Sequence, residues 1–174
     1  LEKQNDKWRL RVKDQINGAG TDSRLRSAVA LPVGGGQTAL LLLDTARKEL
    51  TVCERDRTGV WQPTQHLTLP TVDFTEAQTL ALGSKSVNAL AFTGVNQAAW
   101  LAFTGSTWKL KERASYETPL KDAELRDVVC GDLTGNGRKD FVFLETAKNH
   151  LDLAAWDVPG KVLPALRWRV FEQR

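Results

Sequence analysis

Residues 132–140 carry oxygen-bearing side chains at a spacing that suits a hard metal ion. Counted from Asp132, such side chains stand at positions 1, 3, 5 and 9, and a glycine that permits a sharp turn stands at position 6. Odd spacing in a tight loop directs successive oxygens toward one centre, and the peptide oxygen at position 7 adds a further ligand. The pattern predicts a Ca²⁺ site with the ligands Asp132, Thr134, Asn136, Arg138 (through its carbonyl oxygen) and Asp140.

The same loop has a metal-free interpretation. Asp and Asn side chains close turns by bonding to nearby backbone amides, and Gly takes positive φ, without any cation. A helical calcium hand is excluded because position 12 is Phe143, inside a strand-like run, so the pattern fits a loop between two strands. Only two carboxylates contribute, and Arg138 and Lys139 oppose the cation, so we expect a dissociation constant on the order of 10⁻⁴ to 10⁻³ M.

Other reactive groups are few. His66 and His150 are the only imidazoles in the sequence, and neither has a second metal ligand at helical or hairpin spacing. The sequence has no motif of a nucleophile elbow, a phosphate-binding loop or a dinucleotide site, and we interpret residues 34–36 as a hairpin turn. We therefore expect no catalytic residues, no organic cofactor and no enzymatic activity.

The elements that position the loop repeat about every 50 residues. Residues 25–29 (Leu-Arg-Ser-Ala-Val) align with residues 125–129 (Leu-Arg-Asp-Val-Val), and residues 41–46 align with residues 142–147. Tryptophans at positions 8, 61, 108 and 168 mark the same interval. A fixed period of this length predicts a repeat architecture with three copies in the chain.

Each copy contains short apolar runs bounded by Gly, Asn, Asp, Thr and Pro, which is typical of β-strands. Four antiparallel strands per copy predict an all-β chain of β-propeller blades over residues 24–69, 76–115 and 123–171. Residues 8–12 form one extra strand, so we expect residues 1–15 to be the outer strand of a preceding blade. Three blades do not close a ring, hence we expect either further blades in a longer chain, upstream of the first residue, or completion by homo-oligomerisation.

The loop and its flanking strands resemble the calcium loop of FG-GAP/VCBS repeats, which occur in integrin α-subunit propellers and many bacterial surface proteins. That family places the pattern D-x-[DNST]-x-[DN]-G-x-x-D between the first and second strands of a blade, where residues 132–140 also lie. The resemblance implies a calcium-stabilised blade. The corresponding loops, residues 32–38 and 83–86, lack the carboxylates and resemble degenerate copies without metal.

The outer strands have a composition of their own. Residues 8–12, 108–111 and 166–170 alternate apolar with cationic side chains, which predicts one covered and one wet face. These charges discourage strand addition by another chain, and a cationic rim for polyanions is the alternative.

The first strand of the second copy is assigned to residues 79–82. Packing between blades, rather than stacking on sugars, is expected for Trp61, Trp100 and Trp156.

The composition excludes several classes of protein. The 174 residues are 41% hydrophobic and 26% charged, and their net charge of +3 is too small to predict nucleic-acid binding. No apolar run approaches the ~18 residues of a spanning helix, so membrane insertion is not expected. Cys53 and Cys130 each lie in an apolar run, and we expect buried thiols rather than a disulfide.

Two functional hypotheses follow. The first is a non-catalytic, calcium-stabilised binding or scaffold module that recruits a protein or a glycan at a cell surface. The alternative is an accessory or catalytic part of a propeller-type polysaccharide-active enzyme. A calcium site of modest affinity is filled outside cells, so the expected location is extracellular, at the cell surface or in the periplasm.

Overall fold

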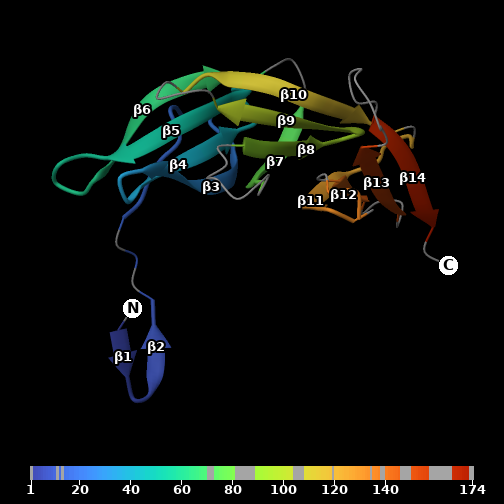
Figure 1. Ribbon diagram of the computed structural model, residues 1–174. Helices are drawn as coiled ribbons and strands as arrows, with labels where there is room; N and C mark the ends of the chain where they lie inside the picture. Colours follow the sequence, from blue (N-terminus) through green and yellow to red (C-terminus); the bar gives the residue numbers. More distant parts are fainter. Residues whose placement is uncertain are drawn as a thin grey trace.

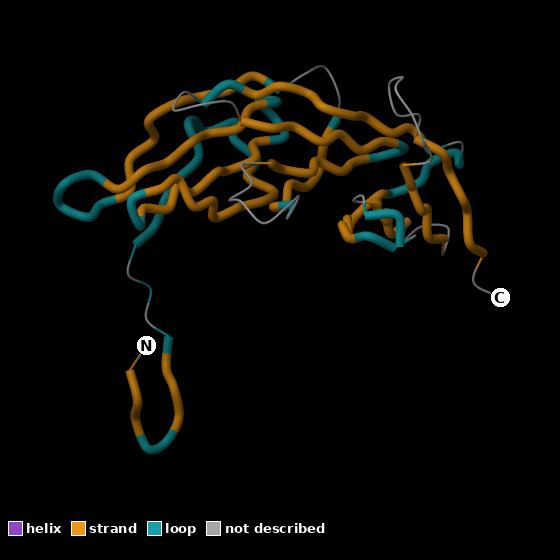
Figure 2. Tube along the Cα trace, viewed as in Figure 1, coloured by secondary structure: helices purple, strands orange, loops and turns teal. Residues whose placement is uncertain are grey.

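The computed structural model describes residues 2–172, apart from residues 11, 13, 70–72, 81–88, 104–107, 119, 134, 138–139, 146–149 and 157–165. At some strand positions only the backbone is described. Every regular element in this part of the chain is a β-strand, as Figure 2 shows. Within the same residues, no helix has the length and apolar character that crossing a membrane requires.

Three four-stranded antiparallel sheets follow one another along the chain. The first contains β3 (Leu25–Gly34), β4 (Gln37–Asp44), β5 (Glu49–Arg55) and β6 (Trp61–Thr68). The second contains β7 (Phe74–Thr79), β8 (Ala89–Gly94), β9 (Gln97–Phe103) and β10 (Leu110–Glu117). The third contains β11 (Leu125–Gly131), β12 (Asp140–Glu145), β13 (His150–Trp156) and β14 (Leu166–Glu172). The predicted all-β class, with four strands in each sheet, is confirmed.

The sheets stand side by side in an arc (Figure 1). Their first strands, β3, β7 and β11, lie along the inner side of the arc, and their fourth strands, β6, β10 and β14, lie along the outer side. Because the fourth strands are the edges of their sheets, the predicted outer edges are confirmed. In β6 the five residues 62–66 are all exposed, as an outer edge should be.

The first strand of the second sheet begins earlier than predicted. It spans Phe74–Thr79 and not residues 79–82, of which 81 and 82 lie outside the described residues. Phe74 and Ala77 are buried, whereas Thr75 and Thr79 are exposed. A strand with one wet side needs few apolar residues, so a search for apolar runs misses it.

A separate hairpin precedes the sheets. It pairs β1 (Glu2–Gln4) with β2 (Lys7–Arg9) and lies apart from the arc (Figure 1). Asn5 and Asp6 both have positive φ, 51° and 58°, as a two-residue type I′ turn requires. The expected single strand over residues 8–12 is therefore corrected, because the strand ends at Arg9 and pairs with the segment before it. The assignment of residues 1–15 to a preceding blade stays a prediction.

The hydrophobic core lies between the sheets. Val29, Leu41 and Leu43 of the first sheet share one buried cluster with Leu90 and Phe92 of the second, and none of the five is more than 6% exposed. A second cluster joins the second and third sheets, through Leu80, Ala91, Ala98, Tyr116, Leu125, Val128, Phe141 and Phe143. Each sheet therefore depends on its neighbour to keep its apolar face away from water.

Tryptophan contributes to this packing at a position other than those predicted. Trp108 packs against the first cluster, and its Nε1 donates a hydrogen bond to Glu54 Oε1 of the neighbouring sheet at 3.3 Å. Trp61 is half-buried on β6, where the guanidinium of Arg55 lies 4.7 Å from its ring centroid. This contact of Trp61 is within its own sheet, so its packing between sheets stays a prediction, and the side chains of Trp100 and Trp156 lie outside the described residues.

The two cysteines are thiols and form no disulfide, as predicted. Cys53 on β5 is fully buried, and burial raises the pKa of its thiol. Cys130 on β11 is half-buried beside the second cluster.

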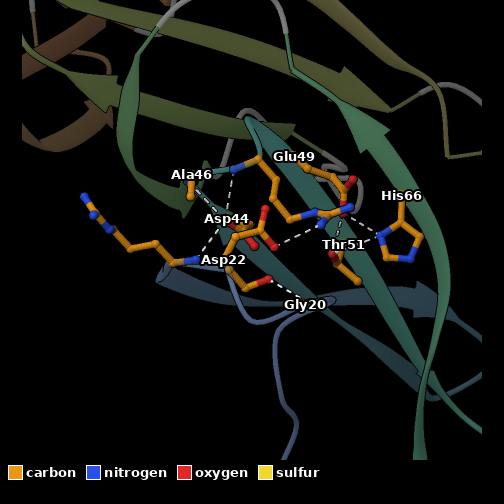
Figure 3. A network of polar contacts seen from close by, with 10 residues as sticks. Gly20, Asp22, Asp44, Ala46, Glu49, Thr51 and His66 are labelled. Atoms are coloured by element: carbon orange, nitrogen blue, oxygen red, sulfur yellow. Dashed lines mark hydrogen bonds and ion pairs between the residues drawn. The ribbon is translucent and has the colours of Figure 1, made fainter.

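A buried carboxylate fixes the entry of the chain into the first sheet. Asp44 is 1% exposed, and its Oδ1 accepts hydrogen bonds from the backbone amides of Arg24, Ala46 and Arg47 at 3.0, 3.1 and 3.2 Å (Figure 3). The third sheet has an equivalent buried carboxylate: Glu145 accepts a hydrogen bond from the amide of Glu124 at 2.7 Å. Burial tends to raise the pKa of Asp44, but the hydrogen bonds outweigh burial and the pKa lies below its usual 3.8.

Replacement of Asp44 should therefore change the acid sensitivity of the fold. A carboxyl whose pKa is lower in the folded state stabilises the fold above its unfolded pKa, and the stabilisation is lost as pH falls from about 3.8 through the folded pKa. We expect Asp44→Ala to lower the free energy of unfolding at pH 7 by about 1–3 kcal/mol and to flatten its pH dependence below pH 4. Urea titrations across this range measure both effects. Asp22→Asn, at an exposed acid, is the control, and a flattening equal to that of Asp44→Ala would contradict the assignment.

Candidate functional site

The innermost strand of every sheet has a β-bulge near its start. The register shifts between Leu25 and Ser27 in β3, between Phe74 and Glu76 in β7, and between Leu125 and Val128 in β11. A bulge leaves a residue out of the ladder and re-aims its side chain, and bulges are frequent beside active sites. The residues outside the ladder are Arg26, Thr75, Arg126 and Asp127.

Arg126 is the centre of a charged cluster across the second and third sheets. Its Nη1 donates to Glu76 Oε1 at 2.8 Å, and its Nη2 donates to Glu124 Oε2 at 2.9 Å. The hydrogen bonds and negative charges of Glu124 and Glu76 raise the pKa of Arg126. All three side chains are between one third and one half exposed, so solvent screens the pairs and they add little to stability. Their effect is to hold the guanidinium and both carboxylates at fixed positions.

These groups line a cleft of ≈180 Å³ at one end of the inner strands. Arg26, Glu76 and Arg126 follow one another at intervals of 50 residues, and each lies two or three residues into its strand. Arg26 is exposed and, among the described residues, has no hydrogen-bond or ion-pair partner. The cleft therefore contains the unpaired guanidinium of Arg26, from the first sheet, and the paired guanidinium of Arg126, from the third. The carboxylate of Glu76 comes from the second sheet. Its full lining is Arg26, Thr75, Glu76, Gly94, Val95, Glu124 and Arg126.

Gly94 lets the second sheet form this wall of the cleft. A Cβ atom at Gly94 would lie 2.2 Å from the carbonyl oxygen of Asp73, the residue just before β7. No side chain fits at that distance, so only glycine allows β8 to pair with the start of β7. The bulge that follows places Thr75 and Glu76 at the cleft.

The predicted metal loop lies at the opposite ends of the same strands, between β11 and β12. Asp132 is exposed, and its two carboxylate oxygens accept hydrogen bonds from the amides of Asn136 at 3.0 Å and Gly137 at 2.9 Å. Asp140 is fully buried, and its Oδ2 accepts a hydrogen bond from the amide of Leu133 at 2.9 Å. The carboxylates at the two ends of the loop thus accept hydrogen bonds from backbone amides inside it. These are the turn-closing hydrogen bonds that the metal-free interpretation describes.

The donor set is nevertheless compatible with a hard cation, because an ionised carboxylate has about four acceptor positions and each bond here uses one. Gly135 and Gly137 have φ of 71° and 79°, which gives the loop its sharp turns. Thr134 and Arg138, two of the predicted ligands, lie outside the described residues. In the described part of the chain, no group of three or more His, Cys, Asp or Glu side chains is arranged to hold a metal. The Ca²⁺ site stays a prediction.

A second polar group, Glu49, Thr51 and His66 on β5 and β6, is not a catalytic relay. His66 Nδ1 lies within hydrogen-bond distance of both Glu49 Oε1 and Thr51 Oγ1, as Figure 3 shows. A relay needs the acid on one ring nitrogen and the nucleophile on the other. His150, the other imidazole of the sequence, has its side chain outside the described residues.

Comparison with known proteins identifies the architecture. No protein-family model and no curated protein sequence matches this chain. A solved structure does match: the periplasmic gluconolactonase PpgL of Pseudomonas aeruginosa, with a TM-score of 0.57 and 15% sequence identity. The match covers 86% of this chain and 41% of that one, so this chain spans less than half the length of the enzyme. The fold is that of β-propeller blades.

This comparison corrects one expectation and leaves others open. The prediction that the chain is not an enzyme is contradicted, because a solved structure with a matching fold is that of an enzyme. Short motifs and imidazoles carry no signal for a site built from charged residues that are far apart in the chain. The resemblance to FG-GAP/VCBS repeats has no matching family model, so it stays a prediction.

Sequence reasoning also missed Arg26, Glu76 and Arg126. Two of them lay inside the aligned segments 25–29 and 125–129, where they served only to detect the repeat. The signal that was available is the 50-residue interval between charged residues at the start of each first strand. A spacing close to the repeat period places side chains near the same end of successive inner strands, although by strand register Thr75, and not Glu76, is the counterpart of Arg26.

Gly94→Ala tests the close approach that builds the cleft. The added methyl group forces β7 and β8 apart, and we expect a loss of about 1–3 kcal/mol in the free energy of unfolding. Gly131→Ala is the matched control, because a Cβ there meets its nearest neighbour at an ordinary 3.7 Å. Equal melting temperatures of both variants and the wild type would contradict the close approach.

Proposed function

We propose that this chain is part of a propeller-type enzyme that acts on sugar-derived substrates, with the substrate bound at the cleft of Arg26, Glu76, Glu124 and Arg126. The observation that carries the proposal is the alignment of three bulged inner strands, which brings charged residues 50 positions apart into one cleft. The likeness to a gluconolactonase supports a substrate of the sugar-lactone or sugar-acid class. Since that enzyme is periplasmic, we propose the same kind of location.

The side chains of the cleft suit the hydrolysis of a lactone. Arg26, which has no partner in the described part, binds the hydroxyl groups of the sugar or the carboxylate of the product. Glu76 accepts a proton from the attacking water, whose oxygen bonds to the lactone carbonyl carbon. Arg126, held by Glu124, stabilises the negative oxygen that forms. The ring C–O bond then breaks, and the ring oxygen takes the proton held by Glu76 to become the hydroxyl of the sugar acid.

Binding and turnover test this assignment separately. We expect the wild-type chain to bind D-gluconate in isothermal titration calorimetry. Arg26→Ala should weaken this binding about ten- to hundredfold, because it removes one or two hydrogen bonds to a charged group. Hydrolysis of D-glucono-δ-lactone, followed with a pH indicator, should fall by a factor of about 10² or more in Glu76→Gln.

Arg57→Ala is the control, because it removes an exposed arginine near the opposite end of the first sheet. Loss of binding in this control to the same extent as in Arg26→Ala would show a general charge effect and contradict the site. Failure of the wild-type chain to bind gluconate and to hydrolyse the lactone would overturn the proposed function.

We also propose that Ca²⁺ binds the loop at residues 132–140 and stabilises the third blade. Asp132 and Asp140 supply the carboxylates, and Asn136 supplies an amide oxygen. The ion adds positive charge that balances the two carboxylates, and the chain around it contributes the turns at Gly135 and Gly137.

Thermal unfolding with Ca²⁺ or with a chelator tests the calcium loop. At a Ca²⁺ concentration about a hundredfold above the dissociation constant, binding to the folded state raises the melting temperature by about 5–10 °C. Asp132→Asn removes the charge and one of the two acceptor oxygens that bind the amides of Asn136 and Gly137, so we expect it to abolish the Ca²⁺ shift and also to lower the melting temperature in chelator. Absence of a shift in the wild type contradicts the metal site.

A further inference from the structure

The bulge in β11 leaves the main chain of Arg126 outside the ladder with β12. The ladder pairs Leu125 and resumes at Val128, so Arg126 has no paired residue on β12. A hydroxyl group of the second blade binds there: Thr93 Oγ1 donates a hydrogen bond to the carbonyl oxygen of Arg126 at 2.9 Å. Thr93 is only 1% exposed. A buried side chain of one blade therefore fixes the backbone of the residue that carries the paired guanidinium of the cleft.

Thr93 also lies opposite the residue of its own sheet that binds Arg126. In the β7–β8 register Thr93 pairs with Glu76, whose Oε1 accepts the hydrogen bond from Arg126 Nη1 at 2.8 Å. Thr75 Oγ1 in turn donates a hydrogen bond to the carbonyl oxygen of Thr93 at 3.3 Å. One residue of β8 is thus the strand partner of Glu76 and the hydrogen-bond partner of the Arg126 backbone.

The two blades stay in contact along the chain after Thr93. Val95 forms an isolated antiparallel bridge with Glu124, which is the second carboxylate bound to the guanidinium. Asn96 then exchanges two hydrogen bonds with Ala123, each of 2.7 Å. The end of β8 therefore runs beside the entry of β11, and both carboxylates of the charged cluster are placed by it.

We propose that Thr93 is a positioning residue of the cleft, whose hydroxyl fixes the bulge so that the guanidinium of Arg126 stays against Glu76 and Glu124. The ion pairs alone hold the guanidinium weakly, because their side chains are 36–49% exposed and solvent screens them. For catalysis the inference rests on the proposed function, in which Arg126 stabilises the negative oxygen. The positioning of Arg126 itself does not depend on that function.

NMR of the arginine side chains in the full chain tests the positioning. Rotation about the Cζ–Nε bond is slow when a carboxylate holds each Nη, so Arg126 should give separate Nη signals in the wild type, and Arg126→Lys assigns them. Thr93→Val replaces the hydroxyl with a methyl group, and it should accelerate this rotation about five- to tenfold, the effect of one neutral hydrogen bond. Thr93→Ser keeps the hydroxyl and should keep the rotation slow. Thr93→Ala, which also lacks the hydroxyl, is the second test variant and should behave like Thr93→Val.

Ser27→Ala is the matched control for a general loss of bonds between blades. It removes a hydrogen bond of 2.8 Å from a hydroxyl to the carbonyl oxygen of Ala77, at the junction of the first and second blades. The rotation of Arg126 should stay slow in this variant, and circular dichroism checks that every variant is folded. Fast rotation in Ser27→Ala, or slow rotation in both Thr93→Val and Thr93→Ala, would overturn the positioning role.

Turnover tests the consequence for the proposed function. For D-glucono-δ-lactone, kcat should fall about tenfold in Thr93→Val and KM should change less than about twofold, because Arg126 acts on the charge that forms in the transition state. Thr93→Ser should recover most of kcat, and equal losses in both variants would mean a packing role and contradict the inference. A wild type that shows slow rotation of Arg126 but no hydrolysis would instead overturn the proposed function, and the positioning of Arg126 would stand.

Discussion

The apolar layer between neighbouring sheets is the constraint on which the rest of this structure depends. A four-stranded sheet of this size has two apolar faces and cannot bury both alone. Phe92 and Leu41 come from different sheets and are both fully buried in one cluster. Because each sheet is covered by the next, the angle between sheets is fixed by side-chain packing, and the inner strands are brought together on one side of the arc.

The cleft is a consequence of this arrangement. Inner strands have a neighbour in their own sheet on one side only, so a bulge near their start costs few hydrogen bonds and turns a side chain toward the inner side of the arc. The same bulge occurs in all three blades, and it gives the cleft Arg26 from one blade, Thr75 from the next and Arg126 from the last. Polar bonds across the junctions hold the strands in place: Ser27 Oγ donates to the carbonyl of Ala77 at 2.8 Å, and Thr93 Oγ1 donates to the carbonyl of Arg126 at 2.9 Å.

Much of the fold could be predicted from the sequence, because its strands are short apolar runs at a constant interval. The third sheet follows the predicted runs closely, since both β11 and β12 are apolar and bounded by a glycine-rich loop. The prediction failed at β7, which is a mostly polar strand that contains Thr75, Glu76 and Gln78. Its buried side chains are those of Phe74 and Ala77. It also failed at the β1–β2 hairpin, whose Asn5-Asp6 turn joins two strands without an apolar pattern. The sequence alone could not assign Arg126 and Glu76 to one site, because they are 50 positions apart in the chain. Only the packing of the second sheet against the third brings Arg126 Nη1 to 2.8 Å from Glu76 Oε1.

Hydrogen exchange measured by mass spectrometry on the wild type and on Phe92→Ala tests the shared core most directly. Phe92 belongs to the second sheet, and its truncation should cost about 3–5 kcal/mol. If the core lies between the sheets, protection falls by similar amounts in β4 of the first sheet and in β8 of the second. Loss of protection confined to the second sheet would mean that each sheet is stable by itself, and it would contradict the account of how the inner strands are held together.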